Sequence, residues 1–461
     1  MQDFDLIVIG GGSAGYAAAR TFQEEGGSVA VVDGGAELSG LCILRGCMPS
    51  KTLIYSAEML HLAKQGKVFG FECRDARADM ASIQSRKKQI IAEFADYRKG
   101  QLNDGRFSLF RLRAWFLDEK SVQMEDGTVI RADKFIISTG SKISMPPVLG
   151  LDQVSFKTSD DVLDLSEIPK EVVVLGGGIV ACELSQFLHR VGSKVTLLQR
   201  SSHILKEFPE RASTCVQCKF REEGMIVKTG VSIERLEQTD DETIRVDYLH
   251  EGGSQSIETK FLFHALGRAP ATDRLNLAEI GVRIKKSGHI QTNAFQQTSV
   301  PHIYAAGDCA GPHEIVHIAI RQGETAANHA LGKVTEPISY DHLLGVVFTD
   351  PQVASVGALP KDLDDSGIEY LSAEYPFDDH GKSILMEAKH GYVAVHAEKK
   401  TGVVLGAECV GKDAGELIHT LSVAVSMRAT VHQLARADWY HPTLSEIWTY
   451  PIEDLAETID E

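Results

Sequence analysis

Two cysteines separated by four residues, Cys42 and Cys47, could form a redox-active dithiol. In a regular helix, residues five positions apart point about 140° away from each other, whereas a disulfide needs Cα atoms about 4.4–6.8 Å apart. A bridge between these thiols therefore requires a distorted turn, and Gly46 offers the backbone freedom for it. The competing interpretation is two small buried apolar residues, the common state of cysteine.

The dithiol follows a segment that is typical of a dinucleotide-binding unit. An apolar stretch at 4–9 leads into the glycine-rich run 10–15, and a second apolar stretch at 28–32 ends on Asp33. Glycines at this spacing allow a tight turn and let the backbone approach a pyrophosphate at a helix N-terminus. The acid can accept hydrogen bonds from a ribose. The residues expected to contact the nucleotide here are Gly10, Gly12, Ser13, Ala14, Gly15 and Asp33.

The same pattern occurs a second time. The apolar stretch 172–175 leads into the run 176–181, and another apolar stretch follows at 194–198. Its expected contacts are Gly176, Gly178 and Ala181, where alanine replaces the third glycine, as the fingerprint allows. Two dinucleotide sites in one chain predict electron transfer between two bound cofactors, with the dithiol as a third redox group.

The end of the second unit bears on which dinucleotide it would bind. A site for NAD usually ends this strand in an acid that binds the ribose 2′-OH, but here the position holds Gln199. Arg200 and Lys206 could instead bind a 2′-phosphate. The sequence therefore favours NADPH, with NADH possible, and the competing interpretation is a solvated basic loop.

Composition excludes several classes of protein. The chain has 461 residues, enough for about three domains, and 43% of them are hydrophobic. A net charge of −17 argues against nucleic acid and anionic membranes as partners. Eight cysteines in such a length are no disulfide framework. Because no signal peptide and no apolar run of about 20 residues is recognisable, we expect a cytoplasmic protein.

Residues 40–51 resemble the redox-active stretch of the class I pyridine nucleotide–disulfide oxidoreductases. This family includes dihydrolipoyl dehydrogenase, glutathione reductase and mercuric reductase. The cysteine spacing and the tail Pro49-Ser50-Lys51 match the family, whereas Arg45 adds a cation beside the dithiol and leaves the substrate open. The resemblance covers essentially the whole chain.

The resemblance implies an α/β fold with two Rossmann-like dinucleotide-binding domains and a C-terminal α+β interface domain. The FAD domain would comprise 1–146 and 269–335, the NAD(P) domain 147–268, and the interface domain 336–461. A helical arm is expected at 80–100 and an interface-domain helix at 414–429. The functional unit would be a homodimer.

The resemblance also implies roles for residues outside the two glycine runs. Lys51 and Glu183 would form an ion pair beside the flavin, where a cation stabilises negative charge on the reduced ring. The remaining expected cofactor contacts lie in hinge segments, in a second FAD segment and in the segment that follows it: Thr139, Gly140, Gly267, Asp308 and His317.

A histidine near the C-terminus could supply the acid and base that thiol–disulfide exchange needs. His441 is followed five residues later by Glu446, which could hold the imidazole in one tautomer. The resemblance implies that His441 acts on the dithiol of the partner subunit and that the His441–Pro442 bond is cis. The competing interpretation is a surface histidine before a proline turn.

The substrate is expected to be a small disulfide or dithiol, and the enzyme to be most similar to dihydrolipoyl dehydrogenase. Arg20 and Tyr97 lie where glutathione reductases bind their substrate, but Glu324 would repel its carboxylates. The C-terminal cysteine pair of mercuric reductases is not recognisable. A glutathione reductase-like enzyme, another disulfide reductase and a flavin-bearing redox sensor with little turnover remain alternatives. No metal site is expected, and Cys215 and Cys218, on a predicted helix, receive no role.

Overall fold

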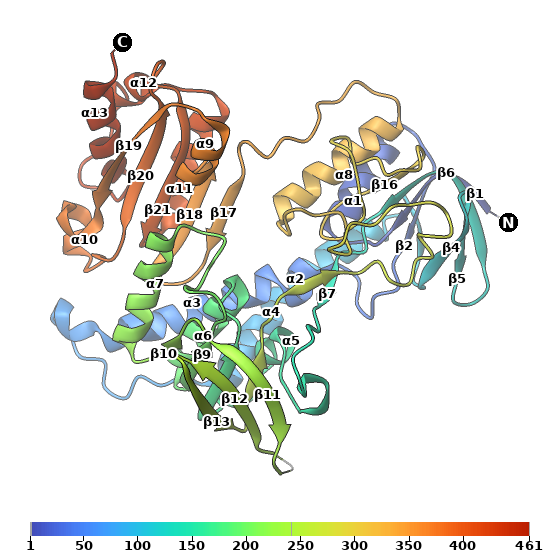
Figure 1. Ribbon diagram of the computed structural model, residues 1–461. Coiled ribbons are helices and arrows are strands. Elements are labelled where there is room, and N and C mark those ends of the chain that lie inside the picture. Colours follow the sequence, from blue (N-terminus) through green and yellow to red (C-terminus); the bar gives the residue numbers. More distant parts are fainter. Residues whose placement is uncertain (1, 241, 461) are drawn as a thin grey trace.

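The computed structural model describes residues 2–240 and 242–460, and its N-terminal part is built on a seven-stranded sheet (Figure 1). The strand order is β3-β2-β1-β6-β5-β4, and β16, from far along the chain, pairs with β6. The pairs β1–β2, β1–β6, β2–β3 and β6–β16 are parallel. The strands are β1 (Gln2–Ile9), β2 (Val29–Val32), β3 (Ser108–Phe110), β4 (Ala114–Asp118), β5 (Ser121–Met124), β6 (Val129–Ile137) and β16 (Ile303–Ala305).

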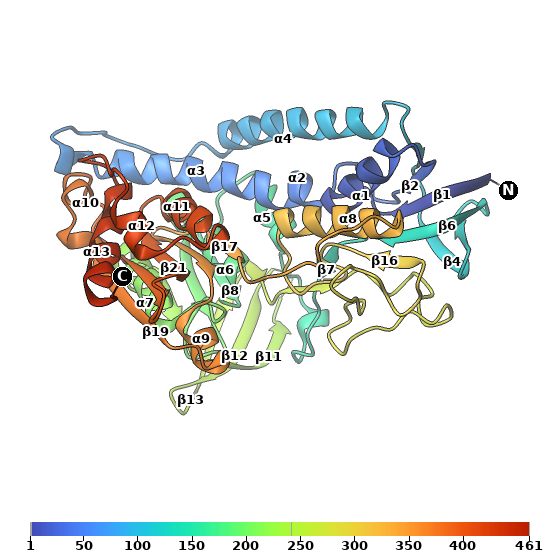
Figure 2. The same cartoon turned by 90° about the horizontal axis from the view of Figure 1, so that it is seen from above.

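Strand β1 is apolar throughout its second half because both faces of the sheet are covered. Leu6 and Val8 pack in one core cluster with residues of α1 (Ser13–Glu24) and α8 (Val316–Ala330). Ile7 and Ile9 pack in another, with residues of β4 and β5. Successive side chains of a strand point to opposite faces, so a strand buried on both sides becomes a continuous apolar run. Helices α1 and α8 lie side by side over the sheet (Figures 1 and 2).

The middle of the chain forms a second parallel sheet of order β10-β9-β8-β14, beside a three-stranded antiparallel sheet. A two-stranded ladder of β7 and β15 connects this part with the N-terminal part. The elements are β7 (Ser141–Ile143), η2 (Leu151–Gln153), α5 (Ser159–Leu163), β8 (Glu171–Leu175), α6 (Ile179–Val191), β9 (Lys194–Leu198), α7 (Glu210–Glu223), β10 (Ile226–Lys228), β11 (Ser232–Gln238), β12 (Ile244–His250), β13 (Gly253–Thr259), β14 (Leu262–His264) and β15 (Arg268–Pro270).

A helical arm runs along one side of the molecule, with α3 and α4 next to each other (Figure 2). It consists of α2 (Leu41–Arg45), α3 (Cys47–Lys64), η1 (Gly66–Phe69) and α4 (Met80–Leu102). The helix predicted at 80–100 is confirmed. Among the described residues, no helix combines the length and the apolar composition needed to span a bilayer.

The C-terminal part is a five-stranded antiparallel sheet, β17-β18-β21-β20-β19, with helices packed against it. The helix predicted at 414–429 ends earlier, because Arg428 adopts a left-handed φ of 54° that closes it. The elements are β17 (Leu344–Val347), β18 (Gln352–Gly357), α9 (Pro360–Ser366), β19 (Tyr370–Pro376), η3 (Phe377–Asp379), α10 (Gly381–Leu385), β20 (Tyr392–Glu398), β21 (Val404–Gly411), α11 (Ala414–Ser426), α12 (Val431–Ala435), η4 (Ser445–Trp448) and α13 (Thr449–Thr458). The predicted α/β fold with two Rossmann-like units and a C-terminal α+β unit is confirmed.

Candidate active site

The two cysteines meet at a break between two helices. Helix α2 ends at Arg45, Gly46 has φ −128° and ψ −118°, and α3 begins at Cys47. This is the distorted turn that the cysteine spacing requires. A Cβ atom on Gly46 would lie 3.1 Å from the Cα of Cys42 and 3.1 Å from the carbonyl oxygen of Leu41, so the turn leaves little room for a side chain. Both cysteines are free thiols, with Cys47 exposed and Cys42 half-buried.

The two thiols differ in their proton affinity. The hydrogen bond from the Cys42 thiol, helped by the positive charge of Lys51, lowers the pKa of Cys47 to about 6, although burial opposes the shift. The same hydrogen bond, together with burial, raises the pKa of Cys42. Position also favours a Cys47 thiolate, because a helix N-terminus stabilises negative charge. At neutral pH the pair therefore holds one thiolate, on Cys47, and one thiol, on Cys42.

Lys51, one helical turn after Cys47, forms the ion pair that the sequence predicts. Its Nζ lies 2.8 Å from Oε2 of Glu183 on α6, and the Glu183 side chain is only 3% exposed. The other carboxylate oxygen of Glu183 accepts a hydrogen bond of 2.9 Å from the backbone N–H of Phe348. Lys51 Nζ also lies 4.7 Å from the centre of the Phe348 ring. Phe348 was missed by sequence reasoning, since it belongs to an apolar stretch without a motif.

Helix α6 binds the segment after β17 through one face. Below Glu183, the Gln186 side chain donates to the carbonyl of Asp350 at 2.9 Å and accepts from its N–H at 2.7 Å. Arg190 Nη2 lies 2.5 Å from Oδ2 of Asp350. Residues three, four and seven positions apart share a helix face. These three side chains of α6 thus hold the C-terminal part against the nucleotide fold beside Lys51.

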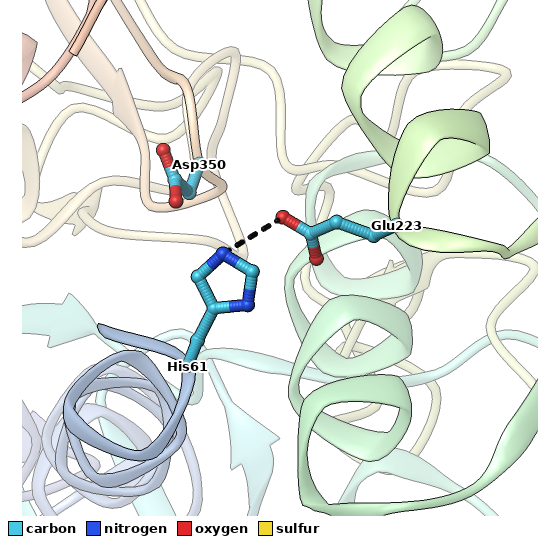
Figure 3. A group of neighbouring side chains, drawn as sticks. All are labelled: His61, Glu223 and Asp350. Carbon is cyan, nitrogen blue, oxygen red and sulfur yellow. Dashed lines mark ion pairs between the residues drawn. The ribbon is translucent and has the colours of Figure 1, made fainter. Parts of the chain in front are cut away.

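One group of metal-ligating side chains occurs among the described residues. His61, Glu223 and Asp350 each offer an atom within 4.8 Å of the others, and His61 Nε2 points at Glu223 Oε1, 3.6 Å away (Figure 3). Arg190 already binds both carboxylates, since its Nη2 lies 2.6 Å from Glu223 Oε1 as well as beside Asp350. A guanidinium thus supplies the positive charge that a metal ion would bring, and the group is an ion-pair network.

The first glycine run has the shape that a dinucleotide requires. A Cβ on Gly10, which has φ +108°, would lie 2.3 Å from the carbonyl oxygen of Ser138, and one on Gly15 would lie 1.9 Å from that of Gly10. Gly12, in contrast, faces open space and has only the Cα of Gly40 at 3.9 Å. The outer glycines are needed for packing, and the middle one leaves its space to a ligand.

Further expected FAD contacts gather at the same sheet edge. Asp33, at the end of β2, accepts the N–H of Gly11 at 2.8 Å. Thr139 and Gly140 follow β6, and a Cβ on Gly140 would meet no atom within 4 Å. Asp308 follows β16 and accepts from the Ser141 hydroxyl at 2.6 Å. Since β1, β2, β6 and β16 are parallel, their carboxyl ends meet, and these residues together with Ser13 and Ala14 at the start of α1 fit an extended dinucleotide such as FAD.

The second glycine run repeats the geometry of the first. Gly176 has φ +114°, and a Cβ there would lie 2.4 Å from the carbonyl oxygen of Ala265. Gly178 and Gly267 face open space, and Ala181 is buried. A Cβ on Gly177 would lie 3.0 Å from the Gln199 side chain, as one on Gly11 would lie 2.9 Å from Oδ2 of Asp33, so Gln199 occupies the place of the ribose-binding acid. These residues fit a second dinucleotide.

The basic loop after β9 also contains a carboxylate, which lies beside one of its two cations. Arg200 and Lys206 are both exposed. Lys206 forms an ion pair of 3.7 Å with Glu207, the next residue. Of the two cations considered for a 2′-phosphate, Lys206 is therefore the one whose charge is partly neutralised by an acidic neighbour.

His441 and Glu446 form the expected base–carboxylate pair. The His441 Nδ1 atom lies 3.0 Å from both carboxylate oxygens, and the peptide bond from His441 to Pro442 is cis. The His441 side chain is 79% exposed and that of Glu446 only 9%. Helix α13, which follows Glu446, lies apart from α2 in both views (Figures 1 and 2). Within one chain, the segment that carries the histidine is therefore separated from the helix that carries Cys42.

The structure also places the other arginine, histidine and cysteine residues that the sequence analysis considered. Arg20 Nη2 lies 2.7 Å from Oε1 of Glu324, and Arg45 Nη1 lies 3.2 Å from Oδ2 of Asp160. His317 is exposed at the start of α8, and packing around its ring together with the charge of Arg321 lowers its pKa. Cys182, Cys309 and Cys409 are buried, whereas Cys215 and Cys218 lie in α7, as predicted.

Comparison with known proteins identifies the family. Residues 4–323 match the pyridine nucleotide-disulphide oxidoreductase model, and residues 344–451 match the dimerisation domain of the same proteins. The chain belongs to this family. It is 33% identical to a mercuric reductase of Lysinibacillus sphaericus over 446 residues, which are 96% of this chain and 81% of that protein.

Other relatives match over nearly the full length of both this chain and their own. A dihydrolipoyl dehydrogenase of Geobacillus stearothermophilus is 30% identical over 453 residues, 96% of this chain and 94% of that protein. The crystal structure of LpdA from Mycobacterium tuberculosis has 26% sequence identity and a TM-score of 0.88, and covers 99% of this chain and 100% of that chain. The chain is thus an oxidoreductase that uses FAD and a nicotinamide nucleotide, and the dimerisation domain supports a homodimer.

Because the positive charge of Lys51 lowers the pKa of Cys47, removing that charge should change this pKa measurably. Replacing Lys51 with methionine removes a cation that stabilises the thiolate, so the Cys47 pKa should rise by roughly one unit or more. The rate of alkylation of the reduced protein, measured against pH, reports this pKa. K51R should keep most of the effect, and K67M, which removes an exposed lysine of η1, is the control. An unchanged alkylation profile in a folded K51M protein contradicts the assignment.

Proposed function

We propose that this enzyme moves electrons between NADPH, FAD, the Cys42–Cys47 pair and a small disulfide or dithiol, as dihydrolipoyl dehydrogenase does with its own substrate. The observation that carries the proposal is the asymmetric dithiol at the start of α3, with a thiolate beside Lys51 and a thiol on the neighbouring cysteine. Turnover, rather than sensing, is favoured because the chain also provides an oriented base.

Each protein group has a distinct part in the reaction. Bound FAD supplies the two-electron carrier between the nucleotide and sulfur. As Cys42 attacks the substrate disulfide, its thiol proton passes to Nε2 of His441; a mixed disulfide forms, and the first substrate thiolate leaves with that proton. The Cys47 thiolate then attacks the Cys42 sulfur, so that the Cys42–Cys47 bond forms and the second substrate sulfur leaves as a thiolate, which takes a proton from solvent by way of His441. Glu446 holds Nδ1–H of His441, which leaves Nε2 free for these proton transfers.

The substrate proposed is an uncharged small disulfide such as lipoamide. Arg20, the residue considered for binding a substrate carboxylate, is paired with Glu324 and so offers little charge to glutathione disulfide. All eight cysteines are free thiols, which suits the reducing cytoplasm as the proposed location. Steady-state assays with lipoamide, glutathione disulfide and mercuric ion test the proposal. We expect lipoamide to be reduced fastest and C42S to be inactive, whereas turnover of mercuric ion alone would contradict it.

The proposed active site combines residues of two subunits. Helix α13, which follows the His441–Glu446 pair, lies apart from α2, which carries Cys42, so we expect His441 to serve the partner subunit's dithiol. Mixing equal amounts of inactive C42S and H441A protein should restore about a quarter of the native sites, because half of the randomly formed dimers regain one intact site of two. Activity after denaturation and joint refolding measures this. If mass spectrometry shows mixed dimers but activity stays absent, the composite site is wrong.

NADPH is proposed over NADH, because Gln199 stands where an NAD site has an acid and Arg200 is available to a 2′-phosphate. Hydrogen bonds to charged groups contribute about 1.5–3 kcal/mol, which amounts to about one to two orders of magnitude in kcat/KM. R200A should lose efficiency with NADPH and keep it with NADH. K206A should do less, since Lys206 is paired with Glu207. Equal losses with both nucleotides would mean that the loop is only a solvated basic turn.

A further inference from the structure

Glu446 lies between two histidines, one exposed and one completely buried. On one side it binds His441 Nδ1 at 3.0 Å. On the other side, Nε2 of His380 lies 3.4 Å from its Oε1 atom, and the His380 side chain has no exposed surface. His380 connects η3 to α10, far along the chain from Glu446. No sequence motif pointed to it.

The surroundings of His380 determine which nitrogen carries its proton. Nδ1 lies 2.8 Å from the hydroxyl oxygen of Ser383, which is also fully buried. Burial is the main influence on His380 and lowers its pKa, so the ring is neutral at physiological pH. With the Ser383 hydroxyl donating to Nδ1, the single ring hydrogen is on Nε2 and points at Glu446. Nε2 has no hydrogen-bond partner among the described residues, and Oε1 of Glu446 lies 3.4 Å away, so its proton is available to the carboxylate.

No other charge competes for this contact in the described surroundings of the ring. The ring of Tyr450 on α13 lies edge-on to His380, 6.3 Å between centres, and stacks on Tyr375 of β19. The Tyr375 hydroxyl donates to Asp379 Oδ2 at 2.9 Å, which occupies that carboxylate. His441 is the remaining titratable group near the pair, and Glu446 separates it from His380.

We propose that His380 is a positioning residue for the acid–base pair: its Nε2–H holds the Glu446 carboxylate in the orientation that fixes His441. The inference rests on the proposed disulfide exchange. A carboxylate with a donor on each side keeps one rotamer, and the imidazole that it binds keeps one tautomer and one direction. His380 itself touches neither the dithiol nor the substrate, so it acts through Glu446 alone.

The molecule contains a matched control for this arrangement. His396 on β20 is also buried, its Nδ1 lies 2.8 Å from the Ser372 hydroxyl, and its Nε2 lies 3.5 Å from Oε2 of the buried Glu408. The three side chains repeat the Ser383–His380–Glu446 arrangement in the same sheet unit, and no described contact links Glu408 with His441. H396L therefore measures what the loss of a buried imidazole does to the fold.

The experiment compares H380L, H380Q and H396L by rapid mixing, with each half of the reaction followed separately. In H380L, reduction of the enzyme by NADPH should be unchanged, while reoxidation by lipoamide slows about tenfold, the effect of losing one long hydrogen bond to the carboxylate. Glutamine carries an N–H of similar reach, so H380Q should recover most of the rate. H396L should lose thermal stability like H380L but keep both rates.

The pH dependence separates positioning from packing. The profile of lipoamide reoxidation against pH should change in H380L, where the Glu446 carboxylate loses a donor, and stay as in the wild type in H396L. Equal reoxidation rates and equal profiles in H380L and H396L would overturn the inference. If wild-type enzyme is reduced by NADPH but reduces no disulfide, the proposed function fails instead.

Discussion

The ion pair between Lys51 and Glu183 is the constraint on which the rest of the site depends. A carboxylate as buried as that of Glu183 is stable only with partners, and removing one partner of such a pair costs about 3–5 kcal/mol. Its partners come from two other parts of the chain: Lys51 from the helical arm and the N–H of Phe348 from the segment after β17. The pair thus fixes α3, and with it Cys47, relative to both the nucleotide fold and the C-terminal sheet.

The site has an electron side, around Lys51 and Cys47, and a proton side, around His441, and both contain a buried carboxylate with two neighbours. On the electron side, the buried carboxylate of Glu183 is shared by Lys51 and a backbone N–H, and Lys51 in turn stabilises the Cys47 thiolate. On the proton side, the buried carboxylate of Glu446 faces two imidazoles. In each case the carboxylate is buried and has a second neighbour besides the group that it pairs with, Lys51 or His441.

Much of this could be predicted from the sequence, because dinucleotide recognition demands glycine at positions where a Cβ would strike the backbone, as at Gly10 and Gly176. The pairs Lys51–Glu183 and His441–Glu446 were predictable too: the family resemblance implies the first, and a histidine with a carboxylate five residues later indicates the second. Phe348, Arg190 and His380 were not, because each acts through a contact between segments far apart in sequence. The ion pair of Lys206 with Glu207 shows the reverse error, in which Lys206 was considered for a 2′-phosphate without the carboxylate next to it.

The most direct test of this account is an anaerobic titration of the purified enzyme with two electrons per site, followed by visible absorption. A Cys47 thiolate against the oxidised flavin should give a long-wavelength charge-transfer band, which C42S should retain and C47S should lose. The band should fade as the pH falls below about 6, where Cys47 takes up a proton. A band that persists in C47S would contradict the central claim that Cys47, and not Cys42, is the thiolate of the pair.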